Sequence, residues 1–510
     1  MMIKNACIVV LSCLMVWSVA RGEAPAVVKG VVFLDANANG KRDDGEKGLS
    51  GVRVTDGVGF AVTGDDGAYS ITIAPDRVLT YAGARVVSVS WPSGMWPSGQ
   101  WWARLDQLAD ATRVDFALRE DKQSLPFAFL HMSDDHGGGW AYKNIAPRVK
   151  ELGGLLKFCF NTGDMGYAGP DNAESMFTGL KKIGQEFPVP MFFTPGNHDM
   201  VKQVERGSGP LAGAGGFTKY LGPIRWSFDY AGVHFASIDW WDPDIKEHVE
   251  GSAPPIAAAW LDKDLSAVKP GTRTILLVHF PSGCKEYFDV IARHKVAQAF
   301  GGHNHRHAFY DYAGVAAVTT VNPETSGSGN LCVVTQDAID VVFYCNGGKG
   351  GPNYHGKLCG LSASWNWKDL IVPKGTPDKT LSAAAVSLDG GTRTLDAGSS
   401  QGVNVVAEFA PGTAKRVGLR FGASSPVEVV FTGQSLVAGG APIPFVLLPS
   451  DAGTVRLQVT IGGGLMTLRA NNRIRMAKPK AVSVTNPAAV TLFAEGGKAE
   501  FKKVDVTALK

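Results

Sequence analysis

The sequence predicts a multidomain protein in which a central α/β domain lies between two all-β sandwich domains. Residues 25–120 and 379–510 consist of short strand-like runs separated by Gly- and Asp-rich turns, a pattern typical of β-sandwiches. Residues 124–360 alternate strand-like runs with amphipathic stretches, which indicates a layered α/β domain. The length agrees, because 510 residues at roughly 150 per domain suggest about three domains.

Composition and charge exclude several classes of protein. With 45% hydrophobic and 19% charged residues, 62 Gly and 28 Pro, the chain is typical of turn-rich globular proteins and not of disordered or coiled-coil ones. Lys and Arg together number 50 and Asp and Glu 47, so no excess charge favours nucleic acid or a membrane surface. The charge therefore indicates no nucleic-acid partner.

Residues 1–22 are typical of a secretory signal peptide. Lys4 precedes an apolar run over residues 6–20, and small residues suited to signal-peptidase cleavage follow it. The run is short for a transmembrane helix, and no later segment reaches 18 uncharged apolar residues, so we predict no transmembrane segment. We expect an exported, soluble protein, periplasmic or extracellular. Lipid attachment at Cys13 is an alternative, but it would leave only a short apolar run before the cysteine.

Export would place the cysteines beyond the signal peptide where disulfides persist. Cys332 and Cys345 flank a hairpin-like stretch and lie symmetrically about its turn at residues 337–340, and opposed positions on antiparallel strands sometimes bridge. Two buried thiols are the alternative, and both interpretations stay open. Five cysteines remain after the signal, so at least one has no partner within the chain.

The first β domain, residues 25–120, contains a loop that fits the calcium pattern D-x-[DN]-x-[DN]-G-x5-E. Calcium prefers hard oxygen ligands on alternate residues, a Gly at the sharp turn and a closing carboxylate. The loop lies between strands and is therefore not an EF-hand. With GLSGVRV and TGDDGAYSI following it, the segment resembles the B-type β-sandwich repeats of serine-aspartate-repeat surface adhesins, over about 60 residues. An acidic turn without metal is the alternative. The candidate calcium ligands are Asp35, Asn37, Asn39, Lys41 through its carbonyl, Asp43 and Glu46.

Four tryptophans fall within residues 91–102 of the same domain. Such an apolar loop usually covers another surface. We expect it to pack against the central domain or to roof part of its cleft; a carbohydrate-binding aromatic strip is the alternative.

The central domain, residues 124–360, carries five short polar motifs, each directly after a strand-like run. They are Asp134-Asp135-His136, Gly163-Asp164, Gly196-Asn197-His198-Asp199, His279-Phe280-Pro281 and Gly302-His303-Asn304-His305. Open α/β sheets build their sites beyond the carboxyl ends of their strands, so these side chains should converge. Carboxylates, imidazoles and an amide together suit two divalent ions of the transition-metal type, and Mn, Fe and Zn remain open.

The ordered set D-x-H, G-D, G-N-H-D, H-x-P and G-H-x-H resembles the calcineurin-like metallophosphoesterase superfamily, over about 240 residues. The resemblance implies a layered β-sandwich flanked by helices. It also implies that His198 is the general acid and that Asp199 orients it. The implied ligands are Asp134, His136, Asp164 and His305 for one ion, and Asp164, Asn197, His279 and His303 for the other.

This reading predicts a hydrolase that acts on a phosphate monoester or diester. Two divalent ions can share a water and lower its pKa, so that a metal-bridging hydroxide attacks phosphorus while His198 protonates the leaving oxygen. The leaving group is not specified by the sequence. The alternative is a surface or glycan-binding protein with an inactive phosphoesterase fold.

Other residues near these motifs have competing interpretations. His131 and His234 lie within strand-like runs, where buried histidines with structural partners are the favoured reading. His307 would either contact substrate phosphate or face a strand, and Trp240 would line a substrate wall or pack between domains. Tyr167 completes G-D-x-x-Y, a spacing in which purple acid phosphatases use Tyr as an iron ligand, but His136 argues against that role here.

Residues 361–378 are predicted to form a linker, and residues 379–510 the second β-sandwich. Its runs loosely resemble the accessory β-sandwich of invertase-like glycoside hydrolases. The segment shows no carboxylate pair in a catalytic context, so we interpret it as an accessory domain, with glycan or cell-surface contact as a candidate role.

Overall fold

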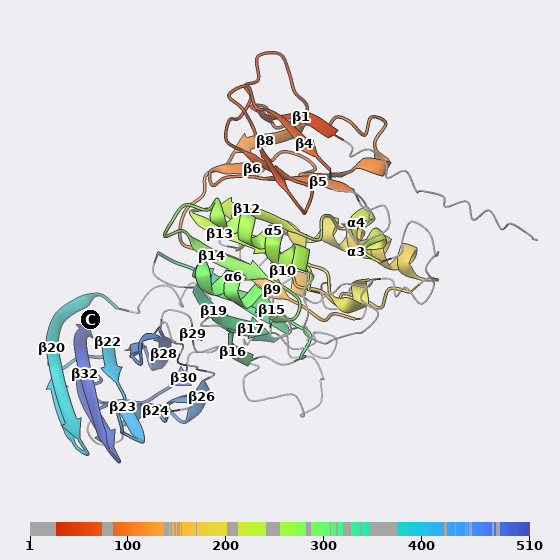
Figure 1. The fold of residues 1–510 in the computed structure, drawn as a ribbon. Coiled ribbons are helices and arrows are strands. Elements are labelled where there is room, and N and C mark those ends of the chain that lie inside the picture. The colour runs from red at the N-terminus through yellow and green to blue at the C-terminus, as the bar shows by residue number, and fades with distance from the viewer. Residues whose placement is uncertain are drawn as a thin grey trace, which may run out of the picture.

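The computed structural model describes most of the chain from residue 27 onward. The described residues are 27–73, 85–136, 142, 145–146, 149, 154, 156–169, 171–200, 213–240, 255–281, 287–305, 308–312, 315–319, 328–336, 339–345, 375–422, 426–433, 435–443, 445, 447, 451–471, 474–475 and 480–510. Figure 1 shows an N-terminal β region, a central region of sheets and helices, and a C-terminal β region. The predicted fold class is confirmed. The signal peptide and residues 361–374 of the predicted linker lie outside the described residues, while β20 already begins at Pro377. The domain boundaries stay predictions.

The N-terminal region is a pair of four-stranded sheets, in the orders β4-β1-β8-β6 and β3-β2-β5-β7. Alternating buried and exposed residues along β1 place one face of that strand in the core, as the sequence pattern predicts. The strands are β1 (Val27–Leu34), β2 (Arg53–Thr55), β3 (Phe60–Val62), β4 (Ala68–Thr72), β5 (Val86–Ser90), β6 (Met95–Pro97), β7 (Trp102–Arg104) and β8 (Phe116–Glu120).

The central region contains two sheets. The first has the order β11-β10-β9-β18-β19 and the second β12-β13-β14-β15-β17-β16. The strands of the first are β9 (Phe127–Met132), β10 (Leu156–Asn161), β11 (Met191–Phe193), β18 (Ser328–Val334) and β19 (Ile339–Cys345). Those of the second are β12 (Trp226–Tyr230), β13 (Val233–Ser237), β14 (Arg273–Leu277), β15 (Gln298–Gly301), β16 (Ala308–Tyr312) and β17 (Val315–Thr319).

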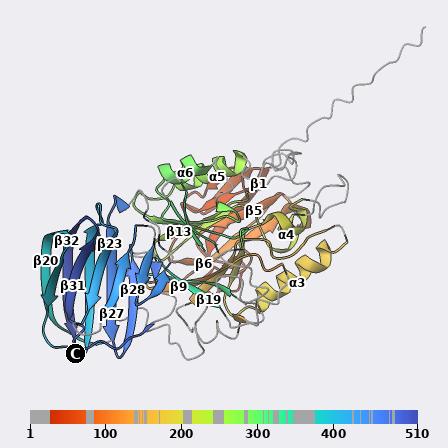
Figure 2. The ribbon, with the colours of Figure 1, turned by 90° about the horizontal axis from the view of Figure 1, so that it is seen from below.

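Helices cover the outer faces of these two sheets, as Figure 2 shows from below. The α-helices described over their whole length are α3 (Ala173–Glu186), α4 (Gly215–Tyr220), α5 (Pro255–Ser266) and α6 (Phe288–Arg293). In β9, Phe127 and Phe129 point to the layer between the sheets, whereas Ala128 and Leu130 pack with α3 and α4. The second sheet packs its other face on α5 and α6. The order is therefore helix, sheet, sheet, helix, because strands buried on both faces need cover on both.

The Trp-rich loop packs against the central region, which confirms the first expectation for it. Trp91 is 1% exposed and stacks on Phe228 of β12, with ring centroids 4.6 Å apart. Trp96 contacts Phe158 and Trp101 contacts Trp226. The N-terminal and central regions therefore share one aromatic core, which removes a large apolar area from water.

A buried polar cluster also joins these two regions. His234 of β13 lies 2.6 Å from the carboxylate of Asp229 through Nδ1 and 2.8 Å from that of Asp264 through Nε2. Arg53 of β2 forms an ion pair with Asp264 at 2.9 Å. Burial alone would lower the pKa of His234, but Asp264 and Asp229 outweigh it and raise the pKa to about 9. We call Arg53, Asp229, His234 and Asp264 the interdomain cluster.

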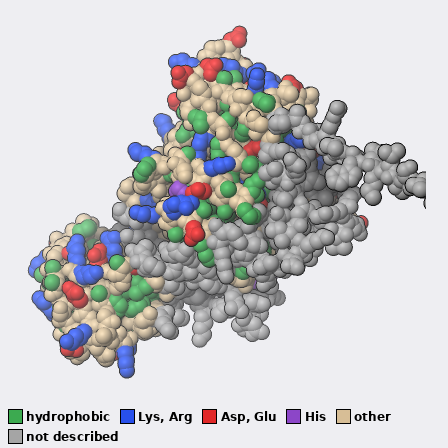
Figure 3. Space-filling model, in the orientation of Figure 1, with side chains coloured by type: hydrophobic (Ala, Val, Ile, Leu, Met, Phe, Trp, Pro, Cys, Tyr) green, Lys and Arg blue, Asp and Glu red, His purple; other side chains and the backbone are tan. Residues whose placement is uncertain are grey.

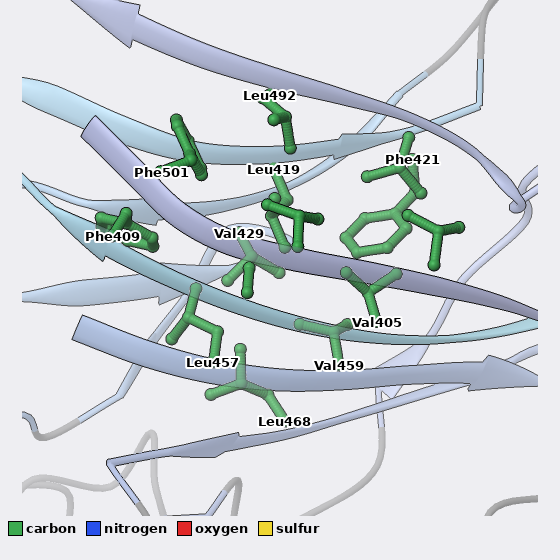
Figure 4. Packing of buried hydrophobic residues seen from close by; sticks show 14 of the residues in the cluster. Val405, Phe409, Leu419, Phe421, Val429, Leu457, Val459, Leu468, Leu492 and Phe501 are labelled. Carbon is green, nitrogen blue, oxygen red and sulfur yellow. The ribbon is translucent and has the colours of Figure 1, made fainter. Parts of the chain in front are cut away.

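The C-terminal region is a sandwich of two sheets around its own core, of which Figure 4 shows ten labelled residues. One sheet has the order β29-β28-β27-β22-β32-β20, with β30 beside β28, and the other β21-β31-β23-β24-β25-β26. The bounds are β20 (Pro377–Asp389), β21 (Thr392–Asp396), β22 (Gly402–Ala410), β23 (Arg416–Phe421), β24 (Val427–Phe431), β25 (Leu436–Ala438), β26 (Ala441–Ile443), β27 (Val455–Gly462), β28 (Leu465–Ala470), β29 (Ile474–Arg475), β30 (Lys480–Ala481), β31 (Ala489–Glu495) and β32 (Lys498–Leu509).

The C-terminal region continues a sheet of the central region. β29 pairs in parallel with β19, with Ile474 opposite Val341. The first central sheet and the first C-terminal sheet therefore form one twelve-stranded sheet.

The structure distinguishes between the two interpretations of Cys332 and Cys345, a disulfide or two thiols. In the antiparallel pair of β18 and β19, Cys332 lies opposite Val341, and Cys345 lies opposite Ser328. Cys332 is buried and free, so the bridge to Cys345 is not formed and Cys332 is a buried thiol. Cys159 is also a buried free thiol.

The described surface agrees with the near-neutral charge. On the face seen in Figure 3, basic and acidic side chains are interspersed over the N-terminal and C-terminal regions. Among the helices that the structure describes, none has both the length and the apolar character needed to cross a membrane.

Candidate metal centre

The five polar motifs meet at the carboxyl edges of the two central sheets. β9, β10 and β11 are parallel, as are β13, β14 and β15, so the loops after them emerge at matching edges. The motif residues follow β9 (Asp134, His136), β10 (Asp164), β11 (Asn197, His198, Asp199), β14 (His279) and β15 (His303, His305). The structure therefore brings together all nine residues that the sequence predicted for this site.

The backbone at five of these residues adopts the left-handed conformation, which is unusual for residues other than Gly. The φ angles are 58° at Asp134, 44° at His136, 54° at Asp164, 66° at His303 and 50° at His305. Such conformations cost energy and persist where the surroundings hold them, often at functional sites. Here they turn each side chain inward at the end of a strand.

Two glycines leave room for the carboxylates. A Cβ on Gly196 would lie 2.2 Å from Oδ1 of Asp164, and a Cβ on Gly302 would lie 2.0 Å from Oδ2 of Asp134. Any other residue at either position would displace a carboxylate, so the Gly in each motif serves the geometry of the site.

The first group of side chains consists of Asp134, His136 and His305. Nε2 of His305 lies 3.3 Å from Oδ1 of Asp134, and Nε2 of His136 lies 4.0 Å from the same oxygen. The two Nε2 atoms are 3.1 Å apart. One nitrogen from each ring and one carboxylate oxygen therefore face a common point, with these atoms within 4.8 Å of one another.

The second group consists of Asp164, His279 and His303. Nε2 of His279 lies 3.1 Å from Oδ2 of Asp164 and 3.3 Å from Nδ1 of His303. Nδ1 of His279 donates to the carbonyl of Thr162 at 2.8 Å, which leaves Nε2 without a proton when the ring is neutral. The sequence analysis missed Thr162, whose place directly before the Gly163-Asp164 motif was the available signal.

Asp164 lies between the two groups. Its carboxylate also forms a group with His136 and His198, and Nε2 of His198 lies 4.0 Å from its Oδ2. Its Oδ1 accepts the backbone N–H of His198 at 2.8 Å. The position fits the bridging role that the family resemblance implies for this residue.

Several polar atoms at the site have no protein partner among the described residues. Oδ1 of Asn197 and Nδ1 of His136 are buried and form no hydrogen bond there. Buried polar atoms are usually satisfied, so an orphaned amide oxygen needs a reason. A cation would satisfy Asn197 and the paired imidazole nitrogens together, and the donor set of carboxylate, imidazole and amide suits divalent transition metals. These residues therefore fit the divalent metal ions that the family resemblance implies.

Electrostatics favour a cation at the second group. Burial alone would raise the pKa of Asp164, but His279 and His198 outweigh it and hold that pKa well below its usual range. Burial alone would lower the pKa of His279, but Asp164 raises it to about 9. Burial and then the charge of His279 lower the pKa of His303 to about 4. The group thus attracts one positive charge strongly.

Asp199 forms hydrogen bonds to the backbone of the loops at the site. Its Oδ2 accepts the backbone N–H groups of Asp164 at 2.7 Å and Gly196 at 2.8 Å, and its Oδ1 accepts that of Met165 at 2.9 Å. These hydrogen bonds of Asp199 all go to backbone groups, and an effect of Asp199 on the His198 imidazole stays a prediction. Asp199 fixes the two loops that carry Asp164 and His198.

The site opens to solvent at His198 and His305, whose side chains are 29% and 37% exposed, while those of Asp134 and His279 are buried. Trp240 is only 2% exposed, and its ring packs on those of His279 and His303 at 5.7 and 5.0 Å. Of the two interpretations of Trp240, a substrate wall or packing between domains, its burial agrees with packing, here against two imidazoles of the metal centre. The other expected substrate contact, His307, lies outside the described residues.

The calcium-like loop at residues 35–46 differs from the metal centre, because its polar side chains form hydrogen bonds within the loop. Both carboxylate oxygens of Asp35 accept backbone N–H groups, from Asn39 and Gly40. Asp43 accepts the side-chain amides of Asn37 and Asn39, and Glu46 accepts the backbone N–H groups of Ala36 and Asp43. The candidate ligands therefore bond within the loop, and calcium binding there stays a prediction.

His131 and His234 are both structural, as the favoured interpretation held. His131 is fully buried and hydrogen-bonds Thr162 Oγ1 at 2.9 Å and Asn330 Nδ2 at 3.0 Å. His234 belongs to the interdomain cluster.

Comparison with known protein families supports the resemblance predicted from the motifs of the central region. The family model of the calcineurin-like phosphoesterases matches residues 127–307. No curated protein matches the chain.

Several solved structures resemble parts of it. A dimetal phosphatase from Danio rerio is 13% identical, with 42% of this chain and 95% of that chain covered and a TM-score of 0.32. The purple acid phosphatase PPD1 from yellow lupin is 11% identical, with 64% and 68% covered and a TM-score of 0.33. A fructosyltransferase from A. japonicus is 16% identical, with 28% of each chain covered and a TM-score of 0.22.

The family model spans all five motifs, and the structure gathers their side chains at one edge of the paired sheets. Residues 127–307 of the chain, which hold all five motifs, therefore match the calcineurin-like phosphoesterase family model.

Proposed function

We propose that this protein is an exported, binuclear metal-dependent hydrolase of a phosphate monoester or diester. The observation that carries the proposal is the two groups of facing imidazole and carboxylate atoms, together with the buried Oδ1 of Asn197, which has no partner among the described residues. The family is metal-dependent, and its name supplies the substrate class, a phosphoester. Export is inferred from residues 1–22 alone.

The residues divide into two proposed ligand sets that share Asp164. One set is Asp134, His136, Asp164 and His305, and the other is Asp164, Asn197, His279 and His303. Divalent ions, when bound, supply Lewis acidity that lowers the pKa of water and neutralises charge on phosphoryl oxygens. The chain fixes the ligand atoms in advance, since Thr162 orients His279 and Asp199 ties the loops of Asp164 and His198.

His198 is the proposed proton donor. Its backbone N–H is held by Asp164 at 2.8 Å, and its imidazole is partly exposed, so a substrate can reach it. The oxygen that leaves phosphorus needs a proton, and a positioned imidazole is the common side-chain source near neutral pH.

Hydrolysis of an aryl phosphate monoester and the matching aryl diester tests the proposal. Chelator-stripped protein is reloaded with Mn²⁺, Fe²⁺ or Zn²⁺, and metal content is measured in each sample. We expect turnover of at least one ester, and we expect Asn197→Ala to abolish it. Asp43→Asn, in the distant 35–46 loop, is the control that should keep full activity.

Two bound metals per chain without turnover of either ester would contradict the enzymatic proposal. That result would instead favour the alternative, a binding protein that retains a phosphoesterase fold. A glycan or cell-surface role of the C-terminal sandwich belongs to that alternative, and glycan-array binding of the full chain tests it.

A further inference from the structure

We propose that Tyr167 is a substrate-positioning residue whose ring stacks against a flat, unsaturated ring in the leaving group of the phosphoester. The inference rests on the proposed function and deepens it by naming a chemical class of leaving group. It is carried by an exposed aromatic side chain that lies directly beside the proposed proton donor.

Tyr167 is 55% exposed. Exposure alone carries no argument, because single exposed apolar residues are common on protein surfaces. The other large exposed hydrophobic residues in the described structure, Val27, Val62 and Leu108, lie in the N-terminal region, far from the motifs along the chain. Tyr167 differs because of the residues that its ring contacts.

The Tyr167 ring contacts two rings of the metal centre. It stacks on His136, with centroids 4.8 Å apart and planes 21° apart, and meets His198 at 4.5 Å and 72°. The centroids of His136 and His198 are 5.2 Å apart. The three distances place the two imidazoles next to each other beside Tyr167, and more than half of Tyr167 is still exposed.

The backbone fixes this arrangement. The N–H of Ala168 donates to the carbonyl of His198 at 2.8 Å, and the side-chain amide of Asn172 donates to the carbonyl of Tyr167 at 2.9 Å. The segments that carry the ring and the proton donor are therefore tied to each other. A preorganised aromatic surface binds a ligand with little loss of conformational entropy.

The leaving group must lie near this surface. His198 protonates the leaving oxygen in the proposed reaction, so the group attached to that oxygen extends past His198, whose ring centroid is 4.5 Å from that of Tyr167. Aromatic rings pair by offset stacking at centroid distances of about 4.5–7 Å, as Tyr167 already does with His136. A flat ring, an aryl group or a nucleobase, therefore gains a contact that an alkyl group of the same charge lacks.

The first test measures binding without catalysis. Metal-loaded wild type is titrated calorimetrically with phenylphosphonate and with methylphosphonate, two non-hydrolysable anions that differ in the flat ring. We expect the wild type to prefer phenylphosphonate by about 3–10-fold, which is the strength of one stacked aromatic pair. Tyr167→Phe should keep the preference and Tyr167→Ala should lose it.

The second test separates an aryl group from a nucleobase. KM and kcat are compared for adenosine 5′-monophosphate and ribose 5-phosphate, and for phenyl phosphate and glycerol 3-phosphate. Tyr167→Ala should raise KM for the ring-bearing member of at least one pair and leave kcat nearly unchanged. The pair that responds identifies the ring.

Metal content is measured in every variant, because Tyr167 also contacts His136. If Tyr167→Ala loses metal, Tyr167→Leu replaces it, since Leu fills the space beside His136 without a flat face. Unchanged preferences in the variants would overturn the role of Tyr167 alone. A wild type that binds neither phosphonate and hydrolyses neither these four monoesters nor the aryl diester would overturn the proposed function, and this inference with it.

Discussion

Two buried clusters of histidine and aspartate lie in the central region, and they differ in how their polar atoms are satisfied. In the interdomain cluster, both nitrogens of His234 face carboxylates and Asp264 also pairs with Arg53. At the metal centre, imidazole nitrogens face each other and Oδ1 of Asn197 has no partner among the described residues.

The comparison separates structural from ligand-binding residues of the same type. His234 lies at the amino end of β13, where the cluster completes its own hydrogen bonds, whereas the metal-centre residues follow the carboxyl ends of strands. A cluster that satisfies itself adds to stability, and a cluster that does not must recruit a ligand.

The largest expected effect comes from Asp164→Asn, which removes the carboxylate shared by both ligand sets. We expect loss of bound metal, measured by elemental analysis, and a fall in kcat/KM of about 10³-fold or more. His234→Gln is the matched control from the interdomain cluster and should keep metal content and kcat. Equal metal content in Asp164→Asn and wild type would contradict the claim that the Asp164 cluster binds metal whereas the interdomain cluster does not.

The second largest effect is expected for a substitution of His198, which lies on the solvent-exposed side of the metal centre. His198→Ala should keep its metal and lose about 10²–10⁴-fold in kcat for esters with poor leaving groups, because proton donation is lost. An aryl ester with a nitrophenolate leaving group should lose much less. An equal loss for both kinds of ester would argue against His198 as the proton donor.

The interdomain cluster should make stability depend on pH. The pKa of His234 is raised from 6.5 to about 9, so its stabilisation is fully present below pH 6.5 and is lost as the pH rises through 9. The free energy of unfolding should therefore fall by up to about 3 kcal/mol between pH 6.5 and 9. Denaturant titrations of wild type and His234→Gln give the measurement as a difference, and parallel pH profiles for the two proteins would contradict it.

The smallest expected effect is that of calcium on the stability of the loop at residues 35–46. Like the interdomain cluster, this loop satisfies its polar side chains with hydrogen bonds among its own residues. Calcium at about tenfold its Kd should raise the free energy of unfolding by about 1.4 kcal/mol. Glu46→Gln should abolish the increase without changing turnover. No response of the wild-type melting temperature at millimolar calcium would mean that the loop is complete without metal.

The sequence predicted the fold class and the meeting of the nine motif residues, because each motif directly follows a strand-like run. It also predicted that the Trp-rich loop packs on the central region. It left two interpretations of Trp240 open, because the burial of this residue depends on His279 and His303, which come later in the chain.

The backbone contacts of Asp199 were out of reach, and the only signal for Thr162 was its place directly before a motif. Both act through backbone groups of residues distant along the chain, with Asp199 bonding Asp164 and Met165, and the Thr162 carbonyl accepting from His279. Residue type does not reveal such contacts, since any carbonyl or carboxylate can form them once the fold brings the loops together.

The pairing of β29 with β19 has a consequence for how the chain behaves when it is shortened. β19 is the last strand of the first central sheet, and Ile474 comes late in the chain. A protein truncated before residue 474 would present an open strand edge, which is a template for intermolecular β-pairing. In the full chain, β29 covers part of the β19 edge and so makes it less available for pairing with another molecule.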